Sequence, residues 1–160
     1  PATEPELQHP ESQRMDMTTH NGPHWQIDLP SDWTLRDNSD GVAYFEAADG
    51  SAGLYIAVWD THITDRPVAE VLDDFVAGSV QGQDNIPGSS WSRQVTRLEE
   101  SDWILDAVWA DQQHRILTRY IAGLPLVLSA SFHDYQFSSV AASNARFGPS
   151  LESIWLLYDQ

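Results

Sequence analysis

The sequence contains no cysteine and no lysine, so all eight of its basic side chains are arginines. The absence of cysteine excludes disulfides, thiolate zinc sites and thiol nucleophiles. The 24 acidic side chains give a formal net charge of −16, which repels the phosphates of nucleic acids and argues against them as partners. Long apolar runs are also missing. The longest, Ile121 to Leu128, is interrupted by Gly123 and Pro125 and is too short to cross a bilayer.

Hydrophobic side chains are scarce in residues 1–22, which are rich in proline, glutamine and acidic residues. Such a stretch buries too little apolar surface to offset the entropy of ordering it, so it is predicted to be a polar leader or linker. The remaining residues, 23–160, are predicted to form a single domain, because the whole length of 160 residues suits one hydrophobic core.

The polar leader contains no apolar segment of the kind that signal peptides need. Two interpretations of the N-terminus stay open. Either Pro1 follows an excised methionine, or the leader is the spacer of an exported protein whose signal has been removed. The cytoplasm is favoured as the location, with the cell envelope, as a processed lipoprotein, as the alternative.

From His24 onward, apolar and polar residues alternate with period two between turn signals, a pattern typical of strands. The strands are expected at 24–29, 42–47, 53–59, 91–98, 103–110, 114–122 and 126–133. Helical spacing predicts two helices, at 67–78 and within 138–157, with a polar loop at 79–90. The sequence therefore predicts an α+β fold, an antiparallel sheet of about six to seven strands flanked by two main helices.

Turn lengths predict which side chains share a face of this sheet. A two-residue turn at 112–113, between the strands expected at 103–110 and 114–122, places Asp106 opposite Arg119. A three-residue loop at 123–125, before the strand expected at 126–133, places Arg115 opposite His133. A third turn is expected at residues 49–50. These registers predict one apolar face covered by both helices. That core face is expected to carry Phe45, Leu54, Ile56, Val58, Trp103, Leu105, Trp109, Ile116, Tyr120, Leu128 and Phe132.

The opposite face is predicted to mix apolar and charged side chains, and it is too apolar for a sheet face that is fully exposed to solvent. Either another element of the chain or a partner is expected to cover it. Trp59 is the side chain for which partner binding and burial in the core are equally favoured. The residues expected to contact a partner are Tyr55, Trp59, Asp106, Arg115, Leu117, Arg119, Ser129 and His133.

Catalytic motifs are mostly absent. No G-x-S-x-G is present, and the His residues show neither H-x-H nor H-E-x-x-H spacing. Ser131 and His133 share a strand face, which leaves a hydrolase as a minor hypothesis, but no oxyanion donor or third group is evident beside them. No metal site and no cofactor are therefore predicted, and an enzyme is not expected.

Residues 25–33, WQIDLPSDW, resemble the start of PsbP/Mog-like domains: an opening strand, Leu-Pro, a small polar pair and then tryptophan. The order of the elements after it is similar over roughly residues 24–157. This superfamily includes DcrB-type proteins, EagR-type secretion chaperones and LpqN-type lipoproteins. The resemblance implies an α+β antiparallel sheet with flanking helices, and non-enzymatic roles as adaptors, assembly factors or effector chaperones.

The sequence and this resemblance together predict a bacterial, non-catalytic protein-binding module that acts as an adaptor or a secretion-chaperone-like protein. Its partner is expected to be another protein, such as a secreted effector or a toxin, and a second copy of the chain is a further partner to consider. The alternative is an acidic immunity or inhibitor protein, whose charge of −16 would neutralise a basic toxin and speed association with it.

Overall fold

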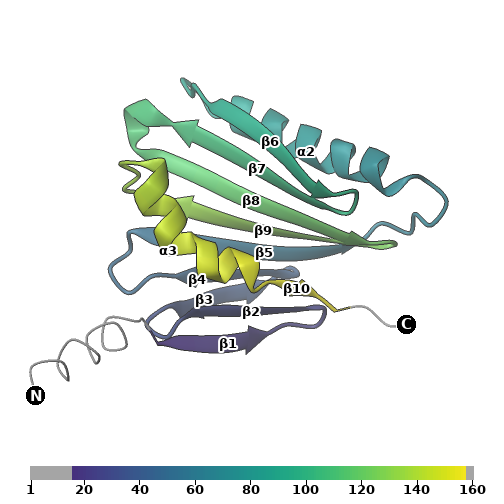
Figure 1. Cartoon of the computed structure of the whole chain (residues 1–160), viewed down its shortest axis with the longest axis horizontal. Coiled ribbons are helices and arrows are strands. Elements are labelled where there is room, and N and C mark those ends of the chain that lie inside the picture. Colours follow the sequence, from purple (N-terminus) through teal and green to yellow (C-terminus); the bar gives the residue numbers. More distant parts are fainter. Residues whose placement is uncertain (1–15, 158–160) are drawn as a thin grey trace, which may run out of the picture.

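The computed structural model describes residues 16–157, and Figure 1 shows the arrangement of their elements. The strands are β1 (Met17–Asn21), β2 (Trp25–Pro30), β3 (Thr34–Ser39), β4 (Val42–Glu46), β5 (Ala52–Asp60), β6 (Ser92–Glu99), β7 (Asp102–Trp109), β8 (His114–Gly123), β9 (Leu126–Asp134) and β10 (Trp155–Leu156). The helices are α2 (Val68–Asp84), α3 (Val140–Glu152) and the short 3₁₀ helix η1 (Ala110–Gln112). All seven expected strands and both expected helical regions are present, which confirms the α+β class.

Two antiparallel sheets make up the fold. The larger has seven strands in the order β3-β4-β5-β9-β8-β7-β6, and the smaller has three in the order β1-β2-β10. In Figure 1, α3 lies in front of the large sheet and α2 lies behind it. The expectation that both helices cover the same face is therefore wrong. Below, the side of the large sheet that packs on α2 is called the α2 face, and the other side the α3 face.

Helix α2 begins directly after Pro67, a residue whose fixed φ suits a helix start. It continues to Asp84, so the first half of the expected polar loop at 79–90 is helical. Contacts further along offset the cost of Gly78 within the helix. Val80 packs on the sheet, and the side-chain oxygen of Gln83 accepts a hydrogen bond of 2.8 Å from the Nε of Arg93.

The closing helical region is shorter than the expected 138–157. Helix α3 starts at an N-cap, where the Ser139 hydroxyl accepts a hydrogen bond of 3.1 Å from the Ala142 amide. It contains Pro149 and ends at Glu152, and the chain then forms β10, which pairs with β2.

The expected polar leader at 1–22 also needs correction. Residues 17–21 form β1, which pairs along its whole length with β2. The leader's first fifteen residues lie outside the part described.

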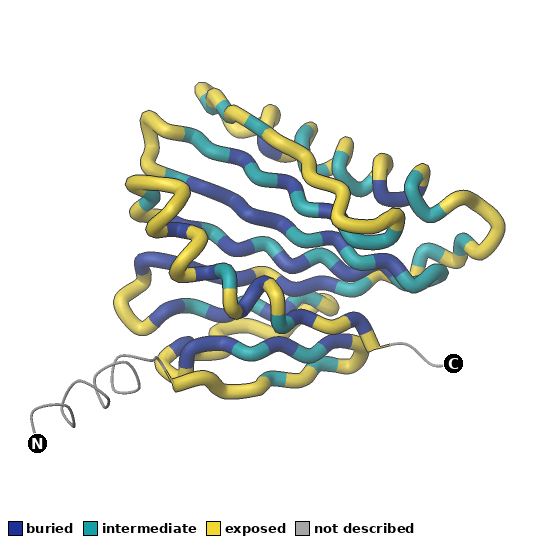
Figure 2. Tube along the Cα trace, in the orientation of Figure 1, coloured by how far each residue is buried: buried dark blue, intermediate teal, exposed yellow. Residues whose placement is uncertain are grey.

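The hydrophobic core consists of two clusters, one on each face of the large sheet. Figure 2 shows that the buried residues concentrate along the central strands of this sheet. On the α3 face, Phe45, Leu54 and Phe132 pack with the small sheet and with Phe147 of α3. On the α2 face, a second cluster packs under α2 and contains Val71, Leu72, Trp103, Leu105, Tyr120, Ala122 and Val127. The single core face predicted from the sequence is thus divided between the two sides.

The registers explain this division. The turn at residues 49–50 is as predicted, with Phe45 opposite Leu54. The loop between β8 and β9 holds two residues rather than three, since Gly123 pairs with Leu126, and the register shifts by one position. Because side chains alternate between faces, a shift of one residue turns all of β9 over relative to β8.

None of the helices in residues 16–157 has the length and hydrophobicity to cross a membrane.

Candidate functional site on the sheet faces

The eight side chains expected to contact a partner do not share one face. The sheet registers place Tyr55, Trp59, Ser129 and His133 on the α2 face. They place Asp106, Arg115, Leu117 and Arg119 on the α3 face, beneath and beside α3. The reason is the one-residue register shift between β8 and β9, which also removes the predicted pairing of Arg115 with His133. The two groups are therefore considered separately.

On the α3 face, Arg115 belongs to the interior. Its side chain is 3% exposed and donates two hydrogen bonds, of 2.9 and 2.7 Å, to the two carboxylate oxygens of Asp106. A third hydrogen bond, of 2.8 Å, runs to the side-chain oxygen of Asn144 on α3. Leu117 beside it is buried at 5% exposure. Neither side chain is accessible to a partner, and their place in the fold corrects the expectation that they are contact residues.

Arg119 forms a second pair of the same kind, with Asp102 rather than with the expected Asp106. Its hydrogen bonds to the two Asp102 oxygens are 3.0 and 2.7 Å long, and a further bond of 2.6 Å reaches the Leu151 carbonyl at the end of α3. Bidentate pairs fix geometry as well as charge. Arg119 and Arg115 therefore hold α3 against the sheet.

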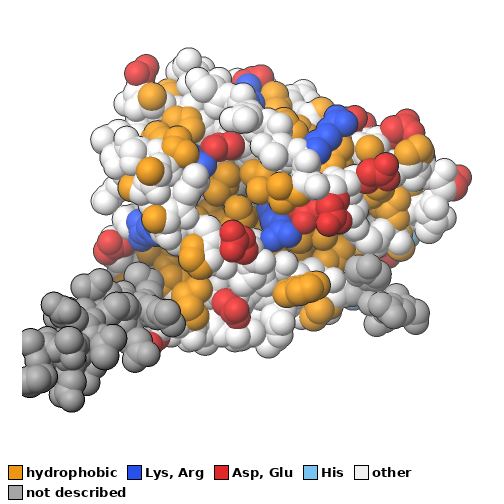
Figure 3. All heavy atoms as spheres, in the orientation of Figure 1, with side chains coloured by type: hydrophobic (Ala, Val, Ile, Leu, Met, Phe, Trp, Pro, Cys, Tyr) orange, Lys and Arg blue, Asp and Glu red, His pale blue; other side chains and the backbone are white. Residues whose placement is uncertain are grey.

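Two clefts adjoin this face beside α3. One has a volume of about 450 Å³ and is lined mainly by apolar side chains, among them Leu98 and Ile104. The other, of about 400 Å³, is lined by the carboxylates of Glu99 and Glu152 together with Trp155. In the space-filling view, hydrophobic side chains gather in a hollow between α3 and the neighbouring strands, close to acidic and basic groups (Figure 3).

On the α2 face, two of the four side chains expected to bind a partner, Tyr55 and Trp59, are exposed, whereas Ser129 and His133 are half-buried. Helix α2 covers the part of this face that holds Trp103, Tyr120 and Val127 and leaves Tyr55 and Tyr135 exposed. Tyr55 is 40% exposed and Trp59 is 44% exposed. The Trp59 ring packs on Phe75 of α2 with 5.3 Å between centroids, so this side chain sits at the edge of the helix, half covered.

Aromatic and histidine rings form a continuous group on the open part, here called the aromatic patch. It consists of Tyr44, Tyr55, Trp91, Trp109, His114, His133 and Tyr135. Tyr44 and Tyr55 stack with centroids 4.5 Å apart, and Tyr55 meets the edge of His133 at 5.2 Å. His114 continues the group to Tyr135 and to Trp91, each with centroids 5.3 Å away.

The two histidines of the patch contact each other directly. Nε2 of His114 lies 3.0 Å from Nδ1 of His133, a hydrogen bond that requires one ring to donate and the other to accept. Burial, together with the neighbouring His114, lowers the pKa of His133 to about 4. Burial also lowers the pKa of His114, against the opposing effect of Asp134. Both rings are therefore neutral at pH 7, and burial raises the pKa of Tyr44 and of Tyr135, so the patch carries no charge there.

The minor hydrolase hypothesis gains no support from these contacts. The hydroxyls of Ser131 and Thr118 hydrogen-bond to each other at 2.8 Å, while the Nδ1 of His133 faces His114. The Ser131–His133 pair that a nucleophile would need does not occur within residues 16–157. Nor does that part of the chain bring together three or more histidine and carboxylate side chains able to hold a metal ion.

Sequence reasoning placed Tyr55 and His133 on the correct open face but missed His114 and Tyr135 as their neighbours. Tyr135 lies two positions after His133, so period-two alternation alone indicates that it continues the same face. The position of His114 depends on the β8–β9 register, which the sequence left one residue in error.

Comparison with known proteins identifies the fold. The chain is similar to cyanobacterial PsbP (CyanoP) from Synechocystis sp. PCC 6803, with a TM-score of 0.62 and 9% identity over 89% of this chain and 94% of that one. It is similar to LpqN of Mycobacterium tuberculosis, a protein involved in cell envelope biogenesis, with a TM-score of 0.50 and 16% identity over 95% and 96% of the two chains.

A protein from Bacteroides thetaiotaomicron VPI-5482 has a TM-score of 0.50 and 11% identity, over 92% of this chain and 50% of that one. No protein-family model and no curated protein sequence matches the chain. The structural similarities confirm a PsbP-like fold and the LpqN part of the expected resemblance. The DcrB-type and EagR-type parts stay predictions.

Proposed function

We propose that the protein is a non-catalytic protein-binding module, and that a partner protein docks on the open part of the α2 face. The observation that carries this proposal is the exposure of aromatic side chains on a regular sheet. Tyr55, Trp59 and Tyr135 are 40%, 44% and 38% exposed, and they lie beside the part of the sheet that α2 covers. Aromatic side chains grouped in this way typically anchor protein interfaces.

The chemistry of the patch suits a protein surface rather than a charged small molecule. The rings stack on one another, so little side-chain entropy is lost when a partner covers them. Because both histidines are neutral at pH 7, covering them leaves no buried charge without a partner. We infer that Tyr55 and Trp59 are the anchors and that the half-buried Ser129 and His133 lie beside them at the base of the contact surface. We further propose adaptor or secretion-chaperone activity, with a secreted effector as partner, and the support for this role is the sequence resemblance to PsbP/Mog-like proteins.

Site-specific photo-crosslinking tests this function. A benzophenone amino acid in place of Tyr55 is expected to give one discrete adduct with a partner in the native organism. The same group in place of Leu35 on β3, which is 45% exposed, is the matched control and is expected to give none. Mass spectrometry identifies the adduct. Equal labelling from both positions would indicate non-specific binding over the protein surface and would refute the proposal.

Trp59→Ala separates a binding surface from a core. We expect it to abolish capture of the crosslinked partner while lowering the free energy of unfolding by about 1–2 kcal/mol, since the ring is already 44% exposed. A fully buried tryptophan typically costs about 3–5 kcal/mol when truncated. A loss of that larger size would place Trp59 in the core, in contradiction to its proposed role.

The alternative, an acidic immunity or inhibitor protein, has its own supporting observation. Six of the seven arginines in residues 16–157 are in ion pairs with aspartates, so the remaining carboxylates dominate the field of the protein. If this alternative holds, the crosslinked partner is a basic protein. Its association rate then falls steeply with salt. A rate that does not change with salt would exclude it.

A further inference from the structure

Strand β6 forms one edge of the large sheet, with exposed residues along most of its length (Figures 1 and 2). It runs for eight residues, Ser92–Glu99, and contains neither proline nor glycine. Within residues 16–157, the backbone of β6 hydrogen-bonds to no strand other than β7. Every second residue of an edge strand presents its N–H and C=O groups outward, so β6 offers a template for another strand.

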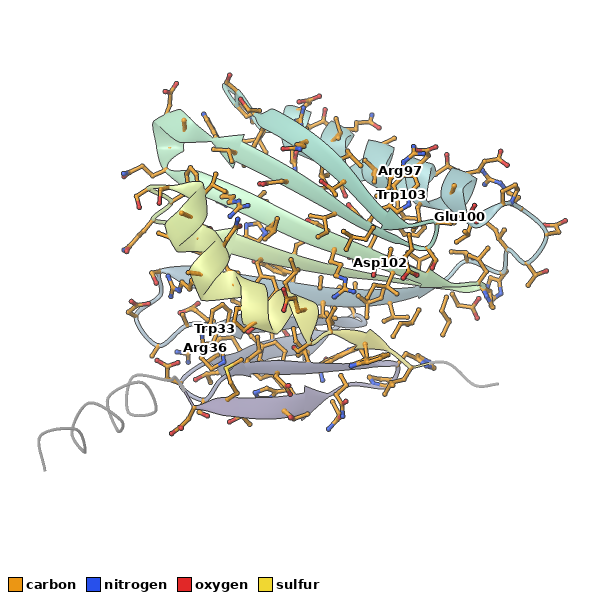
Figure 4. All side chains as sticks on the ribbon, in the orientation of Figure 1. Trp33, Arg36, Arg97, Glu100, Asp102 and Trp103 are labelled. Atoms are coloured by element: carbon orange, nitrogen blue, oxygen red, sulfur yellow. The ribbon has the colours of Figure 1, made fainter. Side chains whose placement is uncertain are left out.

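The opposite edge, β3, is protected in a way that β6 is not. A bulge interrupts β3 in its first half, between Leu35 and Asp37, and the intervening residue is the charged Arg36, labelled in Figure 4. Bulges and charged side chains are the usual features that prevent an edge from pairing. In β6 the only register shift lies at the very end, between Arg97 and Glu99, and the stretch before it is regular.

The two arginines of β6 do not protect its edge either, because both are held toward α2 and the sheet. Arg93 contacts Asp84 of α2 at 2.5 Å. Arg97 lies 3.4 Å from Asp73 of α2, and its guanidinium group stacks 4.1 Å from the centre of the Trp103 ring. Figure 4 shows Arg97 and Trp103 next to each other near the β6–β7 turn.

The surroundings of β6 favour a particular chemistry in a partner. Leu98, which is 51% exposed, forms the rim of the apolar cleft beside α3. Glu99, the last residue of β6, lines the adjoining cleft, and among the described residues its carboxylate is in no ion pair. In an added strand, the exposed Leu98 favours apolar side chains, and the carboxylate of Glu99 at the end of β6, together with the net charge of −16, favours basic ones.

We propose that β6 binds an extended segment of a partner protein, rich in alternating basic and apolar residues, as an additional strand of the large sheet. A second copy of this chain is a poor occupant, because each copy carries a charge of −16 and the two would repel. This surface adjoins the aromatic patch at Trp91, which directly precedes β6, but the proposal does not depend on a partner docking on the patch.

A synthetic peptide provides the test. The probe is a fluorescent peptide as long as β6 that alternates lysine and valine, titrated with the whole protein and followed by anisotropy. A peptide of the same sequence, N-methylated at every second residue, keeps the charge but cannot pair as a strand. We expect the first peptide to bind and to protect β6 amides from hydrogen exchange, and the second to bind at least roughly tenfold more weakly, a difference of about 1.4 kcal/mol.

Two variants with the same change of charge locate the site. Val95→Lys is on β6 and Leu35→Lys is on β3, and the parent side chains are 43% and 45% exposed. We expect Val95→Lys to weaken binding of the lysine–valine peptide at least roughly tenfold and Leu35→Lys to change it less than about threefold. Thermal unfolding of both variants checks that the fold is retained, and Tyr55→Ala, which alters only the aromatic patch, is expected to bind the peptide normally.

Three outcomes would overturn the proposal. Equal binding of the N-methylated peptide would mean attraction to acidic surface without strand pairing. Equal weakening by Val95→Lys and Leu35→Lys would mean that the peptide binds elsewhere. Sedimentation showing a dimer of the protein alone, dissociated by Val95→Lys, would make a second copy the occupant of β6.

Discussion

Replacing Arg115 with methionine keeps most of the aliphatic side chain and removes the charge. Three hydrogen bonds are lost, two to Asp106 and one to Asn144. Breaking a buried ion pair typically costs about 3–5 kcal/mol, because the remaining charge is left unpaired. Asp106 is 24% exposed and keeps some hydration, so we expect the lower part of this range, about 3 kcal/mol. For a domain of this size the melting temperature falls by about 6–12 °C.

Urea denaturation at pH 7 measures this loss, with the midpoint expected to fall and the slope to stay constant. Arg36→Met is the matched control, because Arg36 is exposed on β3, and we expect it to change stability by less than about 0.5 kcal/mol. Combining Arg115→Met with Asp106→Leu removes both charges and is expected to recover much of the stability. An Arg115→Met protein that unfolds like the parent would refute the structural role assigned to Arg115.

Three other changes have defined outcomes. Removing residues 16–21 deletes β1 and its hydrogen bonds to β2, and chemical unfolding is expected to show a loss of more than about 2 kcal/mol. Lowering the pH from about 6.5 to about 4 is expected to reduce the free energy of unfolding by roughly 3 kcal/mol. The reason is that His133 has a pKa of about 4 in the native protein, so over this range the unfolded chain binds a proton that the native chain does not. NMR titration of the His133 ring checks the cause. Gly53→Ala places a methyl group 2.7 Å from the Tyr44 ring, so Tyr44 is expected to leave its stack on Tyr55, with altered near-UV circular dichroism as the readout.

The strands and helices of the core could be predicted because their buried positions give a clear periodic spacing of apolar residues in the sequence. The turn at residues 49–50 also fixed its register, since its length and its glycine with positive φ specify a tight hairpin. The β8–β9 loop was different. Its sequence, centred on Leu124 and Pro125, fits two or three loop residues equally well, and only the positions of the neighbouring strands decide between them.

Exposed strands left no such period. Every residue of β3 is exposed and four of the five in β1 are, so neither alternates between apolar and polar positions. Their pairing partners, β2 and β4, supply the order that their own sequences lack. Only part of the candidate site could be predicted, because strand alternation identifies a face but does not fix the register between strands. Tyr55 and His133 were found from strand alternation, whereas the fate of Arg115 depended on a register that no local pattern determines.

The central position of β2 in the small sheet has a consequence for how the chain folds. β2 pairs with β1 just before it, but its other edge pairs with β10 near the opposite end of the described chain. The Asp28 amide donates to the Ser153 hydroxyl, a contact 125 residues apart in sequence. Contacts so distant require closure of a long loop, which slows folding. During synthesis, the apolar side chains of β2 therefore stay partly exposed until the segment with α3 and β10 has left the ribosome; these side chains are Trp25, Ile27 and Leu29. In that interval a chaperone can bind them.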